Sequence, residues 1–141
     1  MEKIKVHFYK ARAGKLADKV VGIASVFSHV ELEINGVCYS SSNRDRGVRS
    51  KVIDTSNTHK WLSFDLKKDI DENICLGYFK NVEGQQYDWL NIFFSQIIKL
   101  NIQSRNKQIC SEFVANCLGL ESAHKYSPES LFYKLKELNY I

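Results

Sequence analysis

Two side chains far apart in the sequence have the types and surroundings that nucleophilic catalysis requires. Cys110 follows the polar residues 104–108 and lies near the start of a segment with helical periodicity that ends at Gly119, so we expect it at or near the first turn of a short helix. The unpaired N–H groups and the dipole at that end of a helix favour a thiolate, and the same N–H groups can stabilise an oxyanion. Cys110 is therefore a candidate nucleophile.

The same cysteine also fits an ordinary buried helix face. Apolar residues follow it at the i+3, i+4, i+7 and i+8 positions, which are Phe113, Val114, Cys117 and Leu118. Free cysteine is among the most buried residue types in proteins. Spacing alone leaves the choice between a nucleophile and a core residue open.

His29 is the candidate general base. Residues 28–42 alternate polar and apolar side chains around Asn35-Gly36, which is typical of two strands joined by a type I′ turn. Glu31 is two positions from His29, so it shares a strand face with the imidazole and can hydrogen-bond one ring nitrogen while the other faces a thiol. A surface histidine beside a surface glutamate is the alternative interpretation. The remaining histidines have no such acidic neighbour on their own strand: His7, His59 and His124.

The other expected elements complete a small α+β fold. A two-residue turn aligns Ile34 with Val37 and so places His29 opposite Ser42. Alternation or helical periodicity predicts strands over 3–9, 62–66 and 74–79, and helices over 15–27, 89–100 and from Ser127-Pro128 onward. This order predicts an antiparallel sheet packed against helices, with residues 1–141 forming a single domain.

Composition limits the classes of function. Hydrophobic residues make up 44% of the chain and aromatic residues 12%, and the net charge is only +4, so we expect a folded domain without a nucleic-acid partner. The densest basic stretch, Arg44 to Lys51, is interpreted as a solvated loop, or as a lip that attracts an anionic substrate. Neither an export signal nor a transmembrane segment is evident, so a cytoplasmic location is expected.

Four cysteines without a Cys-x-x-Cys pair predict reduced thiols and no metal site. The oligomeric state is left open by the sequence.

Five short segments together resemble the circularly permuted branch of the NlpC-type papain-like cysteine hydrolases. That branch includes lecithin retinol acyltransferase and many small bacterial and phage proteins. The segments are Ser28-His29-Val30-Glu31-Leu32, Tyr39-Ser40-Ser41-Ser42, Arg46-Gly47-Val48-Arg49, Tyr87-Asp88 and Cys110-Ser111-Glu112-Phe113-Val114. The histidine strand precedes the cysteine helix, which is the permuted order.

The resemblance implies a permuted papain-like core, a Cys110–His29 pair and a third polar residue that orients the histidine. Ser41 or Ser42 occupies the usual third position, but we favour Glu31, because a carboxylate also stabilises an imidazolium. By this resemblance Tyr87 corresponds to a family tyrosine near the oxyanion site, and the alternative is an aromatic residue that flanks a helix start. We assign Tyr87, Ser42 and Arg49 to substrate binding. No cofactor is implied.

We therefore expect a cysteine-dependent hydrolase or acyltransferase that cleaves an amide bond, or else an ester or thioester, through an acyl-enzyme on Cys110. The substrate would be a small molecule, a peptide or a lipid acyl group. One alternative is a catalytically weak or inactive member of the fold that binds a host factor. Another is a basic module for nucleic acid or anionic membranes that uses residues 44–51 and the apolar helix at Trp89.

Overall fold

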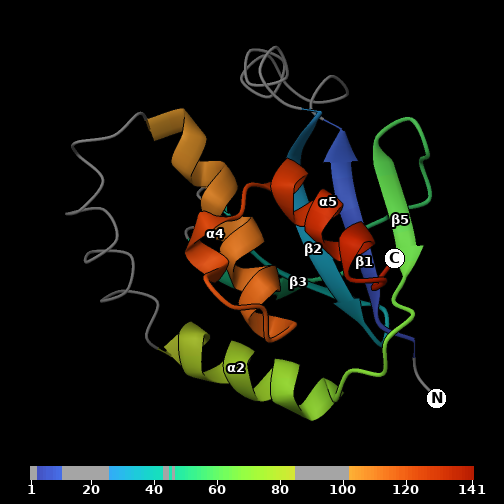
Figure 1. The fold of residues 1–141 in the computed structure, drawn as a ribbon. Coiled ribbons are helices and arrows are strands. Elements are labelled where there is room, and N and C mark those ends of the chain that lie inside the picture. Colours follow the sequence, from blue (N-terminus) through green and yellow to red (C-terminus); the bar gives the residue numbers. More distant parts are fainter. Residues whose placement is uncertain (1–2, 11–25, 43–44, 46, 85–101) are drawn as a thin grey trace.

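The computed structural model describes residues 3–10, 26–42, 45, 47–84 and 102–141. Within these ranges five antiparallel strands form one sheet in the order β4-β3-β2-β1-β5, with helices packed against it (Figure 1). The strands are β1 (Lys5–Lys10), β2 (Phe27–Ile34), β3 (Val37–Ser42), β4 (Gly47–Lys51) and β5 (Trp61–Asp65). The helices are α2 (Glu72–Gly84), α4 (Ile102–Cys117) and α5 (Pro128–Glu137), with a 3-10 helix η2 (Ala123–Lys125) before α5. The expected α+β fold is confirmed.

The hairpin of β2 and β3 has the predicted turn and register. Asn35 and Gly36 both have positive φ angles, 54° and 80°, as a type I′ turn requires. Ile34 is the Cα partner of Val37, and Leu32 is that of Tyr39. The ladder runs only from the Ile34–Val37 pair to the Leu32–Tyr39 pair, so the expected alignment of His29 with Ser42 is not part of it.

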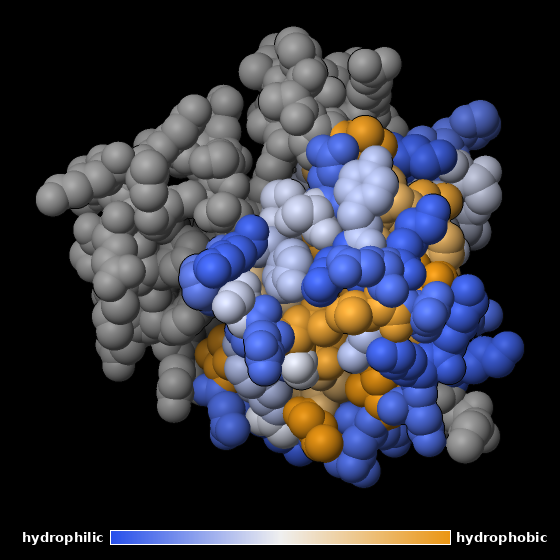
Figure 2. Space-filling model, viewed as in Figure 1, coloured by the Kyte–Doolittle hydropathy of each residue, from blue (hydrophilic) through white to orange (hydrophobic). Residues whose placement is uncertain are grey.

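The core lies between the sheet and helices α4 and α5. Alternate residues of β1 and β2, including Phe8, Val30 and Leu32, are fully buried against these helices. The Phe132 ring of α5 packs on Phe8, with ring centroids 5.4 Å apart. Hydrophilic side chains make up much of the described surface in this view, with apolar side chains showing between them (Figure 2).

The start of α5 is also as predicted. Ser127 is the N-cap, and its Oγ accepts a hydrogen bond from the Ser130 N–H at 3.2 Å. Pro128 follows as the first helical residue, where its missing N–H costs nothing. The helix that covers β2 therefore begins at a boundary encoded in the local sequence.

Two expected elements are wrong. Residues 74–79 lie in helix α2, in which Cys75 and Phe79 are buried one turn apart, because a short apolar run does not distinguish a strand from a helix. The Asp71 carboxylate accepts from the Asn73 N–H at 2.9 Å and caps this helix. The prediction of a solvated loop from Arg44 to Lys51 is wrong for residues 47–51. Gly47–Lys51 forms the edge strand β4, which pairs with β3.

Two of the expected helices fall mostly or entirely outside the residues that the structure describes. Residues 15–25 of the helix expected over 15–27 lie outside the described residues. Phe27, at its expected end, belongs to strand β2. The helix over 89–100 lies outside them entirely. Among the described helices, none has the length and apolar character needed to cross a membrane.

Truncation of Leu131 should test the packing of α5 on the sheet. Leu131 is fully buried, so Leu131→Ala should lower the free energy of unfolding by about 2–5 kcal/mol. Tyr133 on the same helix is 60% exposed, and Tyr133→Ala should cost less than about 1 kcal/mol. Chemical denaturation measures both losses, and equal losses would contradict this placement of α5.

Candidate active site

The histidine strand and the cysteine helix meet in the structure. His29 lies near the start of β2, Cys110 lies in α4, and the two elements pack against each other. The Cys110 thiol is a hydrogen-bonding and electrostatic partner of the His29 imidazole. Cys110 has no exposed surface, whereas the His29 side chain is 22% exposed. The two residues singled out from the sequence are thus in contact, and solvent reaches the pair from the side of His29.

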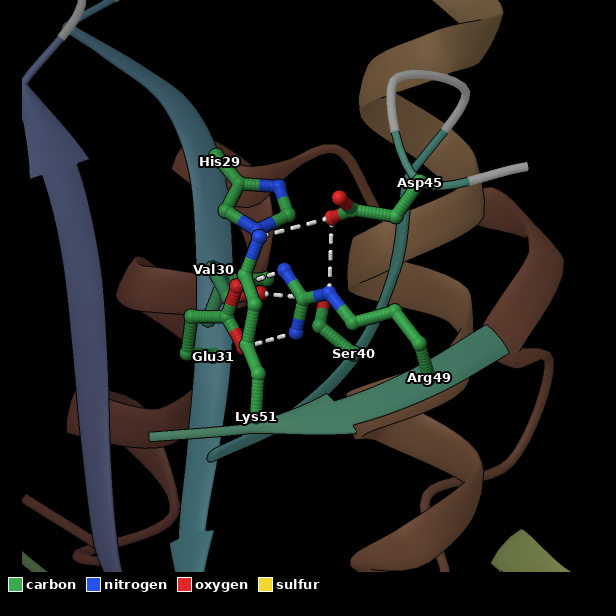
Figure 3. Close-up of polar contacts among 7 residues, drawn as sticks. All are labelled: His29, Val30, Glu31, Ser40, Asp45, Arg49 and Lys51. Atoms are coloured by element: carbon green, nitrogen blue, oxygen red, sulfur yellow. Dashed lines mark hydrogen bonds and ion pairs between the residues drawn. The ribbon is translucent and has the colours of Figure 1, made fainter. Parts of the chain in front are cut away.

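Glu31 holds the other side of the imidazole. His29 Nε2 lies 2.6 Å from Glu31 Oε1, as expected for residues two apart on one strand (Figure 3). The Glu31 side chain is fully buried. Thiol, imidazole and carboxylate therefore form a continuous series through Cys110, His29 and Glu31.

The charges of this series reinforce one another. Burial alone would lower the pKa of His29, but its interactions with Cys110 and Glu31 outweigh burial and raise that pKa to about 10. Burial likewise acts to raise the pKa of Glu31, but hydrogen bonds and charges from Arg49 and His29 bring it below its usual range. A protonated imidazole beside an ionised carboxylate is the favoured state at neutral pH.

Arg49 provides the main countercharge for Glu31. From β4 it reaches across β3, and its guanidinium donates to both carboxylate oxygens of Glu31, at 2.7 Å from Nη1 and also from Nη2 (Figure 3). Its Nε donates to Asp45 at 2.8 Å, and the Lys51 ammonium donates to the same carboxylate at 2.9 Å. The expected role of Arg49 in substrate binding stays a prediction. Its guanidinium here is engaged by two carboxylates of the protein itself.

The position of Cys110 in its helix differs from the expectation. Helix α4 begins at Ile102, so Cys110 lies about two turns inside it and not in the first turn. Only the first four N–H groups of a helix are free, and the N–H of residue 110 is not among them. The polar residues 104–108, interpreted as preceding the helix, are part of it. The polarising group beside the thiol is therefore His29 and not the helix terminus.

The other predicted site residues lie on β3 or outside the described part of the chain. Ser42 ends β3 opposite Gly47, and Tyr87 lies outside the described residues. Ser41 is buried on the other face of β3 from Ser40, and within the described part of the chain its Oγ has no hydrogen-bond partner. The substrate-binding roles of Tyr87 and Ser42 stay predictions.

Sequence reasoning missed a second polar cluster on the sheet. His7 Nε2 lies 2.8 Å from Glu33 Oε2, and His7 Nδ1 lies 2.7 Å from Ser63 Oγ. Cys38 completes this cluster as a third group that could ligate a metal ion. The acidic partner of His7 comes from the adjacent strand, so a search along its own strand does not find it. The register of β1 against β2 and β5 is the signal that would reveal the cluster.

Replacement of Arg49 should destabilise the protein because Glu31 is buried. Arg49→Met should lower the free energy of unfolding by about 3–5 kcal/mol at neutral pH, since it removes the main partner of a buried charge. Lys51→Met, at a side chain 44% exposed, should cost about 1 kcal/mol or less.

The same comparison has a defined pH dependence. The pKa of Glu31 is lowered by folding, so its ion pair contributes stability above the ordinary value of 4.5 and loses it as the pH falls. The stability difference between wild type and Arg49→Met should therefore shrink in acid. A difference that stays constant down to strongly acidic pH would contradict the assigned pairing.

Comparisons of the chain with models of protein families, with curated proteins and with solved structures found no significant match.

Proposed function

We propose that the protein is a cysteine-dependent hydrolase or acyltransferase. Cys110 is its nucleophile, His29 its general base and acid, and Glu31 the residue that orients the imidazole. The observation that carries this proposal is the contact series of buried thiol, imidazole and carboxylate. The bond cleaved is an amide, with an ester or a thioester as the next candidates, in a small-molecule, peptide or lipid acyl substrate.

The two nitrogens of His29 have separate tasks in this mechanism. Nε2 is held by Glu31, so Nδ1 is the nitrogen left for the thiol. Because the imidazole already holds the thiol proton in the favoured state, the thiolate sulfur attacks the carbonyl carbon of the substrate to form a carbon–sulfur bond. When the tetrahedral oxyanion collapses, the bond to the leaving group breaks and His29 gives its proton to that group. A thioester on Cys110 remains.

The second half of the reaction releases the acyl group. Water, or another acceptor, attacks the thioester while His29 accepts the proton of that nucleophile. The carbon–sulfur bond then breaks and the thiolate of Cys110 leaves. Hydrolysis and acyl transfer differ only in which acceptor reaches the thioester.

Glu31 and Arg49 have supporting roles. Glu31 fixes the ring orientation and stabilises the imidazolium that forms when the thiol is deprotonated. The bidentate pair with Arg49 fixes the carboxylate in turn, since both of its oxygens are bound. We infer that Arg49 acts through Glu31 as a positioning residue.

The arrangement of elements supports a permuted papain-like core. The strand that carries His29 precedes the helix that carries Cys110, and α4 packs on β2 and β3. The four cysteines are all buried thiols and suit a reducing compartment, which supports a cytoplasmic location.

A second candidate function is a binding protein that keeps this fold without turnover. The observation that favours it is the position of Cys110, which has no exposed surface and lies inside α4, away from the free N–H groups of the helix terminus. In that case the thiol packs in the core and the host factor binds elsewhere.

Alkylation of Cys110 should distinguish the two candidates. A thiol beside an imidazolium is more reactive than an isolated one, so Cys110 should react with iodoacetamide faster than Cys38, Cys75 or Cys117 at mildly acidic pH. Burial raises the pKa of Cys75 to about 11 and that of Cys38 to about 12, so these two thiols serve as internal controls. Peptide-resolved mass spectrometry in native buffer measures the rates.

The variant His29→Ala should slow this reaction at least about tenfold at the same pH. Its far-ultraviolet circular dichroism should match that of wild type, because His29 is partly exposed. If Cys110 is labelled only after denaturation, or at the same rate in wild type and His29→Ala, then Cys110 is a core residue and the enzyme proposal is wrong.

Loss of the Glu31 charge should reduce turnover more than loss of either serine. Gln retains the size of Glu31 and can accept a hydrogen bond, but it cannot stabilise an imidazolium by charge. Hydrolysis of an activated acyl ester by Glu31→Gln should fall at least about tenfold. Ser41→Ala and Ser42→Ala should stay within about twofold of wild type on the same rate scale.

Intact mass spectrometry shows in each case whether the acyl-enzyme accumulates. Denaturation curves separate a catalytic defect from loss of folding. If a serine variant is the most impaired, the orienting residue lies on β3 and not on β2.

A further inference from the structure

Three neighbouring strands bring an imidazole, a carboxylate and a thiol together at a place separate from Cys110. The donor atoms of His7, Glu33 and Cys38 all lie within 4.8 Å of one another. His7 and Cys38 are buried, and the Glu33 side chain is 17% exposed. Cys38 is the Cα partner of Glu33 across β2 and β3, while His7 comes from β1 on the other side of β2. The folded sheet therefore fixes all three groups.

The donor set is chemically selective. One nitrogen, one oxygen and one sulfur suit a borderline-soft divalent cation such as Zn²⁺, whereas Mg²⁺ and Ca²⁺ prefer oxygen ligands alone. Zinc bonds of about 2.0–2.3 Å place tetrahedral ligand atoms roughly 3.3–3.8 Å apart. The His7–Glu33 distance of 2.8 Å has to lengthen slightly to reach that spacing, and the distances to the Cys38 sulfur, which are at most 4.8 Å, have to change by no more than about 1 Å. The required shifts are of the size that side-chain rotation provides.

The surrounding groups orient two of the three donors. Ser63 Oγ, 2.7 Å from His7 Nδ1, can accept the Nδ1–H and so leaves Nε2 for a metal. The backbone N–H of Ile53 donates to the Cys38 sulfur. Metal-bound histidines in proteins are held by such outer hydrogen bonds, which fix the tautomer and the ring.

Charge and access also fit a divalent cation. The Glu33 carboxylate and the Cys38 thiolate would together carry two negative charges, which one divalent ion neutralises. A cavity of about 530 Å³ is lined by His7 and Ser63 together with the loop of Ile53, Asp54, Thr55 and Ser56. This cavity therefore borders the proposed site at His7.

We propose that His7, Glu33 and Cys38 form a zinc-binding site that joins β1, β2 and β3. On binding, a zinc–sulfur bond replaces the S–H bond of Cys38, and both the Cys38 proton and the proton between His7 and Glu33 are released to solvent. No electron is transferred. Water fills the fourth position. This site goes beyond the proposed hydrolase function and does not depend on it.

Cobalt substitution tests the site directly, because Co²⁺ occupies zinc sites and a cobalt–thiolate bond gives a charge-transfer absorption band. Titration of the purified full chain with Co²⁺ should develop this band to one equivalent, and Zn²⁺ should abolish it stoichiometrically. Cys38→Ser should eliminate the band, and Glu33→Gln should weaken Zn²⁺ affinity at least about tenfold. Ser63→Ala should weaken it by about 10–100-fold, the range for loss of an outer partner.

Matched variants exclude other sources of the signal. Cys75→Ser removes a buried thiol outside the cluster, and His59→Gln removes a histidine outside it, so both should bind Co²⁺ as wild type does. Cys110→Ser should also retain the band, which separates this site from the Cys110–His29 pair. His7→Gln is a further ligand variant. Because His7 is buried, its replacement can prevent folding, and Glu33→Gln is then the test.

The outcomes are decisive in either direction. A stoichiometric band that is lost in Cys38→Ser and retained in Cys110→Ser supports the site. The proposal is overturned if folded wild type gives no band, or if the band survives Cys38→Ser. A band that disappears in Cys110→Ser also overturns it, because the metal would then bind at the other cysteine.

Discussion

The candidate site depends on one buried carboxylate. Glu31 is fully buried, and an ionised group in such a place is tolerated only when it is paired and hydrogen-bonded. Arg49 binds both of its oxygens and His29 binds one of them. These contacts tie β4 to β2 across β3 and set the orientation of the imidazole that meets Cys110. The packing of an edge strand thus follows from this charge, which also adds to the larger effect of Cys110 in raising the pKa of His29.

Local sequence signals predicted those parts of the fold that local interactions determine. The Asn35-Gly36 turn and the Ser127-Pro128 helix start are encoded within a few residues, and both are as expected. The apolar run at 74–79 has no periodicity of its own, so its helical state in α2 follows from its packing against α4. The polar residues 104–108 predict a loop, but helices accept polar residues readily, so α4 begins earlier than the sequence predicts.

The same distinction separates the predicted from the unpredicted site contacts. His29 and Glu31 lie two apart on one strand, so their contact follows from alternation. The Cys110–His29 contact was anticipated through the family resemblance of several short segments. Arg49 reaches Glu31 across an intervening strand, and His7 meets Glu33 across a strand pair. Such contacts depend on strand order and register, which a single sequence does not specify before the sheet is assembled.

The pairing of β2 with β3 through a two-residue turn has a consequence for errors in folding. A shift of this pairing by one residue would exchange the two faces of β2. Val30 and Leu32 would leave the core, and the charges of Glu31 and Glu33 would enter it without their partners. Misaligned hairpins would be strongly disfavoured for this reason. The acidic residues of β2 therefore disfavour shifted pairings when the sheet assembles, in addition to any chemistry that they support.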